Sequence, residues 1–297
     1  ESGIYFTIPK GQLFSDSAKR RAPGTRAARG DYTRTTAPYA CERFAFAHDI
    51  PDPVRANWTG AGDADESGVK LVTNKMIIRE NLRFVSAFMR TGVWATDLTG
   101  VASAPGAGQF LQWDQAGSTP ISDIRRRRRI IKRATNLAPN VLACGGAVFD
   151  ALMNHASILA RLPTTIVQIA ADDEEDTALL ARILGVKEVV VLDGSYNSAD
   201  EGQAAVMTDF VQTTALLAYK PDSPSLDTPS AGYVFSWSDG IGDVGDMIAA
   251  NGGAGIKKYR NPEAEESDAI EANAYSDLRP VSTDCAAFFD SAVAAVT

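Results

Sequence analysis

Cysteine and histidine are scarce in this 297-residue chain, and their scarcity argues against several kinds of site. The three cysteines, Cys41, Cys144 and Cys285, form no C-x-x-C pair, so a zinc ribbon or a thioredoxin-like redox site has no support. We expect them to be reduced and mostly buried thiols. A zinc centre or a Ser-His-Asp triad would have to use His48 or His155. The sequence therefore predicts no metal, no cofactor and no catalytic residue.

Long apolar runs are also missing. No stretch approaches the roughly 20 apolar residues that a membrane-spanning helix needs, so we expect no membrane partner. The apolar fraction of 45% and the charged fraction of 22% are ordinary for a folded soluble protein. The length suits one large domain or two modest ones.

The net charge is −8, but basic and acidic side chains are segregated along the chain. Basic residues dominate 10–34 and the run RRRRRIIKR at 125–133, whereas acids gather at 172–176 and 263–268. Such segregation favours a protein that meets copies of itself through opposite charges. The candidates for contact with a neighbouring subunit or with DNA are Lys19, Arg20, Arg21, Arg26, Arg29, Arg125, Arg126, Arg127, Arg128 and Arg129.

The five arginines at 125–129 are the sharpest charge feature. On a helix, Ile124 and Ile131 would face inward, with Ile130 and Ala134 as further candidates for that face. The arginines would splay around most of the circumference and repel one another unless acid or phosphate lies near. Three interpretations stay open: a solvated face with salt-bridge partners, a neighbouring subunit's acidic patch, or nucleic-acid backbone bound without sequence reading.

Residues 1–45 predict a two-stranded arm with a mobile tip rather than a core element. Short β-like stretches flank AKRRAPGTRAARGDY, which has Pro23, Gly24 and Gly30 and almost no large apolar side chains. Such an arm is marginal alone and needs a surface to lie on, which another subunit can offer.

A long helix is predicted at about residues 66–92, where no Gly or Pro interrupts between Gly68 and Gly92. Its apolar stripe has spacings of seven, four, three and four, through Leu71, Ile78, Leu82, Val85 and Met89. The stripe is widened by Val69, Val72, Met76, Phe84 and Phe88.

From Pro120 onward, helices and strands alternate, which is typical of an α/β layer. The expected order is helix 121–136, strand 140–144, helix 146–161, strand 164–170, helix 174–184 and strand 188–192. A Pro-rich stretch at 221–229 marks a boundary. Further strand-like runs follow at 233–237, 256–260 and 269–275.

The segment GIGDVG at 240–245 matches the G-x-G-x-x-G pattern of dinucleotide-binding loops. Aspartates crowd the place where phosphate would sit, and residues 247–251 reach Gly252-Gly253 after barely one turn. We expect this motif to form a flexible loop rather than a nucleotide site.

Three groups of stretches together resemble the major capsid proteins of tailed bacteriophages, which have the Hong Kong 97 fold. They are RAPGTRAARGDY (21–32) with HDIPDPVRAN (48–57) and VTNKMIIRENLRF (72–84); PISDIRRRRRIIKRATNLAPNVLACGGAVFDALMNHASILARL (120–162); and LGVKEVVVLDGSYNSADEGQ (184–203) with LLAYKPDSPSLDTPSAGYVFSW (216–237). Their order and spacing carry the resemblance over essentially the whole chain.

The resemblance implies an α+β subunit with a Hong Kong 97-like capsid fold. Residues 1–45 would be the N-terminal arm and extended β-hairpin loop, which reaches over a neighbouring subunit. Residues 46–119 with 222–297 would be the peripheral domain, with its long spine helix. Residues 120–221 would be the α/β axial domain, which gathers around five- and six-fold axes.

The resemblance further implies a non-enzymatic protein that self-assembles into pentamers and hexamers of an icosahedral phage head. Such a head is a virion shell, is assembled in the host cytoplasm and encloses double-stranded DNA without sequence specificity. Decoration, portal and scaffolding proteins are further implied partners. The alternatives are an encapsulin-like shell, a nucleotide-binding α/β enzyme, and a non-shell DNA-binding protein that uses Arg125–Arg129.

Overall fold

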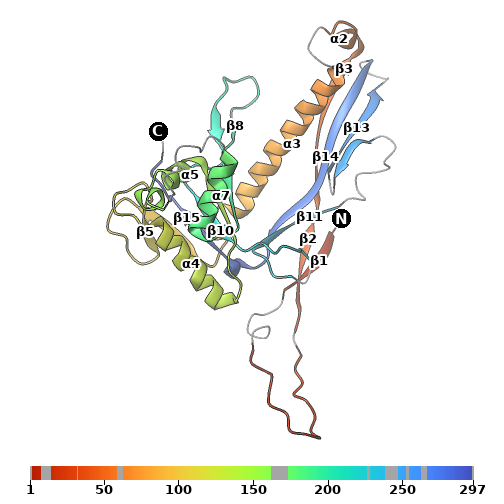
Figure 1. Cartoon of the computed structure of the whole chain (residues 1–297). Helices are drawn as coiled ribbons and strands as arrows, with labels where there is room; N and C mark the ends of the chain where they lie inside the picture. The colour runs from red at the N-terminus through yellow and green to blue at the C-terminus, as the bar shows by residue number, and fades with distance from the viewer. Residues whose placement is uncertain are drawn as a thin grey trace. The chain divides into compact units, whose positions relative to one another are not determined.

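The chain divides into two compact units. The computed structural model describes residues 2–7, 15–31, 33–58, 63–161, 173–225, 228–237, 247–251, 254–261 and 266–295. Unit 1 comprises residues 1–4, 38–84 and 233–279, and unit 2 comprises residues 5–37, 85–232 and 280–297 (Figure 1). Among the described helices, none combines the length and apolarity needed to cross a membrane.

Unit 1 is built on an antiparallel sheet with the order β11-β14-β13-β12, and β3 also pairs with β14. Its strands are β3 (Glu42–Pro51), β11 (Gly232–Ser236), β12 (Met247–Asn251), β13 (Ala254–Asn261) and β14 (Ser267–Pro280). β14 is central because its residues 267–274 pair with β13 while the same residues also pair with β3. The strand-like runs predicted at 233–237, 256–260 and 269–275 are therefore confirmed.

Strand β12 in the Gly-rich stretch 240–255 had no counterpart among the predicted strands. Residues 247–251 form this strand, which pairs with β13. Pairing with a strand supplies the backbone hydrogen bonds that local composition does not announce. The motif GIGDVG at 240–245 lies outside the described residues.

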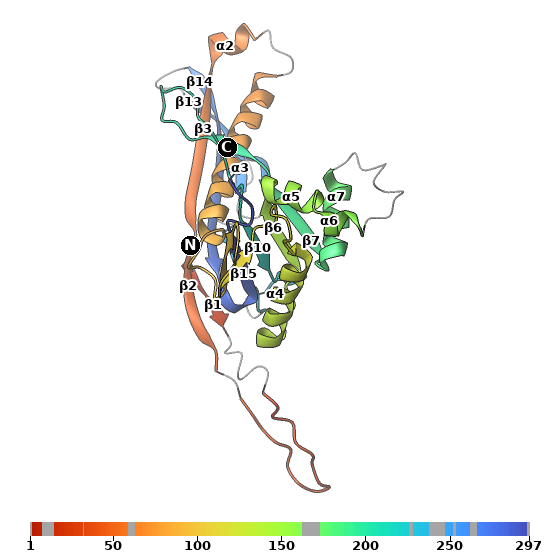
Figure 2. The ribbon, with the colours of Figure 1, turned by 90° about the vertical axis from the view of Figure 1, so that its left-hand side faces the viewer.

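The predicted long helix is confirmed as α3 (Ala64–Phe88), which lies along β14 in both Figure 1 and Figure 2. Within unit 1, its start packs against the sheet through Ala64 and Val72, which meet Ile270 in one apolar cluster. Gly68 lies between them, and a Cβ there would be 2.8 Å from Ile270 Cδ1. Glycine therefore lets helix and sheet approach closely.

The buried face of α3 follows the widened apolar stripe, with Leu71 as the exception. Val72 is fully buried, whereas Leu71, which we placed on the stripe, is 38% exposed. One residue corresponds to a rotation of about 100° around a helix, so the two side chains meet different surroundings.

An ion-pair network in unit 1 joins the starts of helices to the sheet. Asp268 on β14 pairs with Arg55 of α2 (Asp52–Ala56) and with Lys258 and Arg260 of β13. The network is completed by Asp65, which pairs with Arg55 and Lys258, and by Asp52, which pairs with Arg260. Asp268 had been grouped with acids expected to face another subunit; it is instead neutralised inside unit 1.

The cations around Asp268 hold the pKa of its carboxyl at about 2, chiefly through the hydrogen bond from Arg55. Because this pKa lies below the ordinary value of 3.8, ionised Asp268 stabilises unit 1 fully above about pH 4. That contribution is lost as the pH falls toward 2. We therefore expect Asp268→Asn to lower the free energy of unfolding by about 1–2 kcal/mol at pH 7 and by much less near pH 2.5.

Urea unfolding followed by circular dichroism at the two pH values measures this difference. The matched control is Asp222→Asn, which breaks the fully exposed Asp222–Lys187 pair and should change stability immeasurably. An equal loss for Asp268→Asn at both pH values would contradict a role for the ionised carboxylate.

Unit 2 contains a mixed sheet with the order β5-β4-β15-β10-β6-β7. Its strands are β4 (Asp97–Val101), β5 (Gln109–Leu111), β6 (Val141–Gly145), β7 (Glu188–Leu192), β10 (Ala215–Ala218) and β15 (Ala286–Asp290). β15 brings the fully buried Phe289 against Phe110 and Trp113, with ring centroids 5.4 and 5.2 Å away. The end of the chain thus contributes to the core of this unit.

The compact units do not follow the domain boundaries expected from the resemblance. We placed residues 97–111 and 286–290 in the peripheral domain, yet they share a sheet with β6, β7 and β10. Hydrogen bonds between strands so distant in sequence leave no local signal. The assignment of peripheral and axial roles stays a prediction.

Four helices of unit 2 lie in the predicted α/β region: α4 (Pro120–Thr135), α5 (Gly146–Met153), α6 (Ala156–Leu159) and α7 (Asp173–Leu184). The helix predicted at 146–161 is divided in two, with His155 capping α6. The strand predicted at 164–170 lies outside the described residues. A short hairpin, β8 (Ser195–Asn197) and β9 (Met207–Asp209), follows β7.

Residues 1–45 contain the predicted two-stranded element. β1 (Ser2–Thr7) pairs with β2 (Thr35–Ala40), and between them residues 15–31, the arm loop, form neither helix nor strand (Figure 1 and Figure 2). A turn at Ala22–Thr25 has Gly24 at φ +80°, and the Thr25 amide donates to the Ala22 carbonyl at 3.2 Å. Pro23 followed by glycine at positive φ is the signature of a type II turn.

Candidate nucleic-acid or intersubunit surface

Helix α4 carries the arginine run, and its ends follow from local sequence. Pro120 occupies the first turn, where its missing N–H costs nothing, and Asp123 lies near the positive end of the helix dipole. The helix ends at Asn136, which adopts the left-handed conformation at φ 56°. Its direction and register are therefore set before any charge is considered.

The inward face of α4 confirms half of the prediction. Ile124 is fully buried and Ile131 is 4% exposed, both in the core cluster of unit 2. Ile130 is 41% exposed and Ala134 is also exposed, so their inward placement is wrong. The spacing of seven between Ile124 and Ile131 keeps one face inward, and a residue one position away falls off it.

Two of the five arginines are engaged inside unit 2. The Nη2 atom of Arg125 donates to the carbonyl of Ile183 in α7 at 2.5 Å. The Nε atom of Arg128 donates to the carbonyl of Pro139 at 2.8 Å. Both bonds join α4 to neighbouring segments, so these side chains hold the helix in place.

Arg127 is half-buried and belongs neither to the two hydrogen-bonded arginines nor to the exposed ones. Burial lowers the pKa of its guanidinium, and repulsion from Arg126 lowers it further, while Asp123 opposes both. Burial also raises the pKa of Asp123, although Arg126 and Arg127 lower it. Asp123, the acid on α4, is thus itself partly desolvated.

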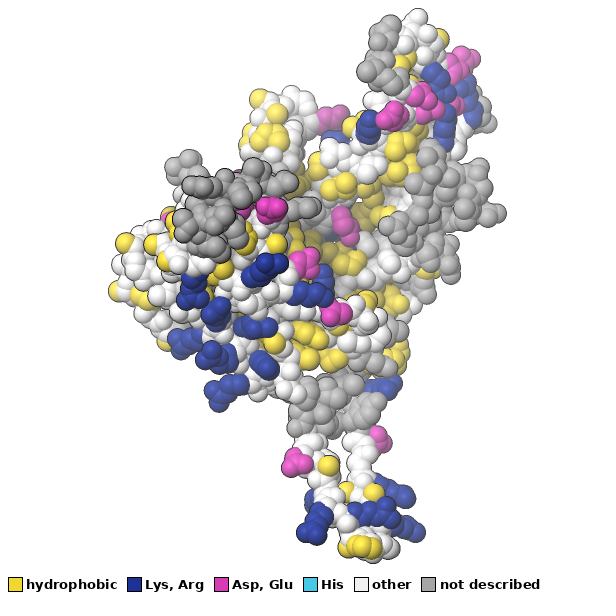
Figure 3. Space-filling view, viewed as in Figure 1, with side chains coloured by type: hydrophobic (Ala, Val, Ile, Leu, Met, Phe, Trp, Pro, Cys, Tyr) yellow, Lys and Arg dark blue, Asp and Glu magenta, His cyan; other side chains and the backbone are white. Residues whose placement is uncertain are grey.

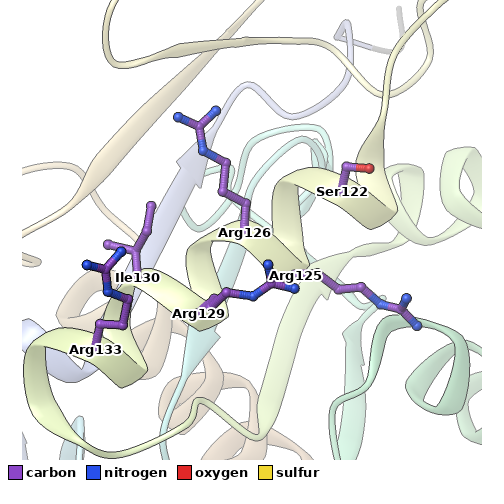
Figure 4. Close-up of a pocket in the computed structure, with 6 residues that line it drawn as sticks. All are labelled: Ser122, Arg125, Arg126, Arg129, Ile130 and Arg133. Carbon is purple, nitrogen blue, oxygen red and sulfur yellow. The ribbon is translucent and has the colours of Figure 1, made fainter.

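Arg126, Arg129 and Arg133 form the third set, here called the arginine stripe. They recur at spacings of three and four and, with Ser122, Arg125 and Ile130, line an open hollow of about 550 Å³ on α4. Figure 4 shows Arg125 extending away from Arg126 and Arg133. In Figure 3, Lys and Arg side chains gather over the part of unit 2 where α4 lies in Figure 1. No carboxylate forms a salt bridge with the stripe within the described chain.

The arm loop holds the second group of candidates. Lys19, Arg20, Arg21, Arg26 and Arg29 are all exposed. Arg21 is the member with an internal role, since its Nε donates to the Thr25 carbonyl and closes the turn. The remaining charges of this group can meet a partner without breaking a described bond.

Sequence reasoning left Arg133 out of the candidate set. Its signal was the spacing of seven from Arg126, which repeats one helical face after two turns. Conversely, Arg125 and Arg128 were included although their hydrogen bonds reach carbonyls that no spacing rule identifies.

His155 caps α6 through its ring. Its Nδ1 atom accepts from the Ser157 amide at 3.2 Å and lies 2.8 Å from Ser157 Oγ, which assigns the proton to Nε2. Nε2 then donates to Ser118 Oγ at 3.1 Å, and that hydroxyl donates to the Trp113 carbonyl. The cluster therefore caps α6 and joins it to the preceding loop.

The cysteines match their expectation as reduced and mostly buried thiols. Cys144 and Cys285 are buried and Cys41 is half-buried, with no disulfide among them. Burial raises the pKa of Cys144 to about 12, so its reactive thiolate is not populated at neutral pH.

Comparison with known proteins agrees with this architecture. Residues 111–226 match the family model of phage major capsid protein E. A phage-related protein from Bordetella bronchiseptica RB50 superposes with a TM-score of 0.67 at 17% identity, covering 98% of this chain and 86% of that one. The capsid of cyanophage P-SCSP1u gives a TM-score of 0.53 at 10% identity, covering 97% and 83%.

An encapsulin complex from Synechococcus elongatus PCC 7942 gives a TM-score of 0.49 at 11% identity, covering 99% and 85%. No curated protein matches. The fold is that of Hong Kong 97-like capsid proteins, and the predicted α+β class is confirmed. The resemblance to tailed-phage major capsid proteins is confirmed as well.

Proposed function

We propose that the protein is a non-enzymatic major capsid protein that self-assembles into pentamers and hexamers of an icosahedral phage head. In this proposal it is assembled in the host cytoplasm and encloses double-stranded DNA in the virion. The observation that carries it is a capsid fold along 97% of the chain, together with the capsid family match at 111–226. Portal, scaffolding and decoration proteins are the further partners of such a shell.

The arm loop supports assembly because, apart from the turn at Ala22–Thr25, little within it stabilises its conformation. Residues 15–31 are exposed throughout, contain no helix or strand, and carry five basic side chains against two acidic ones. Ordering such a segment costs conformational entropy that local apolar burial does not offset. A neighbouring subunit would supply the missing surface, with Lys19, Arg20, Arg26 and Arg29 meeting its acids.

Electron microscopy of the purified chain tests the proposal directly. We expect closed particles of uniform diameter, formed from the chain alone or with a co-expressed scaffolding protein. A folded chain that stays monomeric under both conditions at high concentration would overturn the shell proposal.

The contents of native particles separate a phage head from an encapsulin-like shell. We expect particles from producing cells to protect double-stranded DNA of uniform length from nuclease. Particles that protect no DNA and contain a co-purifying enzyme instead would replace the phage-head proposal with the encapsulin-like one.

A further inference from the structure

The arginines of α4 fall into groups with different roles, which the sequence of the run does not reveal. Arg125 and Arg128 donate hydrogen bonds to the carbonyls of Ile183 and Pro139, respectively. The arginine stripe, Arg126, Arg129 and Arg133, makes no hydrogen bond or ion pair within the described chain. Of the six arginines on α4, two are therefore fixed by hydrogen bonds, three form the stripe, and Arg127 is half-buried.

The stripe concentrates like charge on one side of α4. Arg126 to Arg129 and Arg129 to Arg133 are separated by three and four residues, the spacings at which like charges on a helix repel. One further cation, Lys132, lies beside Arg133 in the last turn. An anion outside unit 2 would relieve this repulsion.

We propose that Arg126, Arg129 and Arg133 bind the phosphate backbone of double-stranded DNA, while Arg125 and Arg128 hold α4 in position. This inference rests on the proposed function, because a phage head brings a subunit surface against packaged DNA. The stripe spans about 10 Å along the helix axis. Duplex DNA carries one negative charge per about 1.7 Å of its own axis, so roughly six phosphates lie opposite that length.

The chemistry of the side chains suits this occupant. Guanidinium forks bind phosphate oxygens through two parallel hydrogen bonds and keep their charge at every physiological pH. Arg126, Arg129 and Arg133 line an open hollow rather than a closed pocket, which admits a long polymer. Contacts of this kind do not read bases, so binding is independent of sequence.

A second copy of the chain is the competing occupant. Its acidic candidates are the run at 172–176, whose later residues begin α7, and the adjacent Asp200 and Glu201 between β8 and β9. Both are short clusters of carboxylates, whereas the stripe extends along the helix. A continuous line of phosphates fits the row better.

Salt-dependent binding of the unassembled chain to short duplexes tests the proposal. The test variant is Arg126→Gln/Arg129→Gln/Arg133→Gln, measured by fluorescence anisotropy between 50 and 200 mM salt with two unrelated DNA sequences. The matched control, Arg161→Gln/Lys187→Gln/Lys220→Gln, removes three exposed positive charges elsewhere on unit 2. A third variant with lysine at the three stripe positions keeps the charge.

Removing three phosphate contacts should reduce the slope of log K against log salt by about 2.7 and weaken binding roughly 500-fold at 0.1 M salt. The control should change both quantities far less, both DNA sequences should respond alike, and the lysine variant should retain most of the slope. Circular dichroism melting establishes that each variant is folded.

The other outcomes discriminate clearly. If the glutamine variant keeps the parental slope, or the control loses as much, the DNA proposal is overturned. If it keeps DNA binding but no longer forms shells, the stripe is a contact between subunits. If the parent binds DNA through the stripe yet never forms shells, the proposed function fails while this inference stands.

Discussion

Shells should disappear when residues 1–31 are deleted, while the shortened chain remains folded. The deletion removes β1 and the arm loop, whose described residues from 15 to 31 are all exposed. Most apolar side chains of both cores lie outside this segment, with Tyr5 as a buried exception. If arms join subunits, many weak contacts act together in a closed shell, so their joint loss affects assembly far more than folding.

Electron microscopy and sedimentation would show the loss of particles, and circular dichroism melting would show that the fold persists. A length-matched control replaces Lys19, Arg20, Arg26 and Arg29 with glutamine and keeps both strands. This control should assemble with reduced salt dependence, because the arm remains but its charge does not. If the truncated chain formed normal shells, the arm would not be required for assembly.

The elements with strong local signals were predictable. α3 combines an uninterrupted apolar periodicity with acids at its start, and α4 begins at a proline and ends at an asparagine. β7 was predicted at 188–192 and occupies those residues because an apolar β-branched run bounded by polar residues has few alternatives. The predicted stripe of α3 included both Leu71 and Val72, and the structure shows that Val72 is buried while Leu71 is 38% exposed.

The pairing of distant segments was not predictable from one sequence. β15 joins β4 and β10 in one sheet although nearly 200 residues separate it from β4. β12 depends on β13 for its backbone partners, and no strand was predicted in its Gly-rich surroundings. These hydrogen bonds form between segments whose proximity is a property of the whole fold.

The arginine run shows the same limit of prediction from sequence at the candidate site. Its charge and its helix could be predicted, and so could the need for an anion. Which arginines are engaged inside unit 2 could not be predicted, because Arg125 donates to the Ile183 carbonyl, 58 residues away. Membership of the arginine stripe is decided by which guanidinium groups the fold has already engaged.

Replacing Ile131 by alanine should lower the free energy of unfolding by about 2–4 kcal/mol, whereas the same change at Ile130 should stay within about 0.5 kcal/mol. The two residues are adjacent and chemically identical, but Ile131 is 4% exposed and Ile130 is 41% exposed. Only the first substitution leaves a cavity in the core of unit 2. Urea unfolding of both variants beside the parent measures the difference.

The comparison also tests the orientation on which the arginine stripe depends. If Ile130→Ala destabilised unit 2 as much as Ile131→Ala, α4 would be rotated toward Ile130. Arg126, Arg133 and Ile130 lie along the same side of the helix at spacings of three and four, so that rotation would carry the stripe inward. A large difference between the two isoleucines keeps the stripe exposed, as binding to an extended polyanion requires.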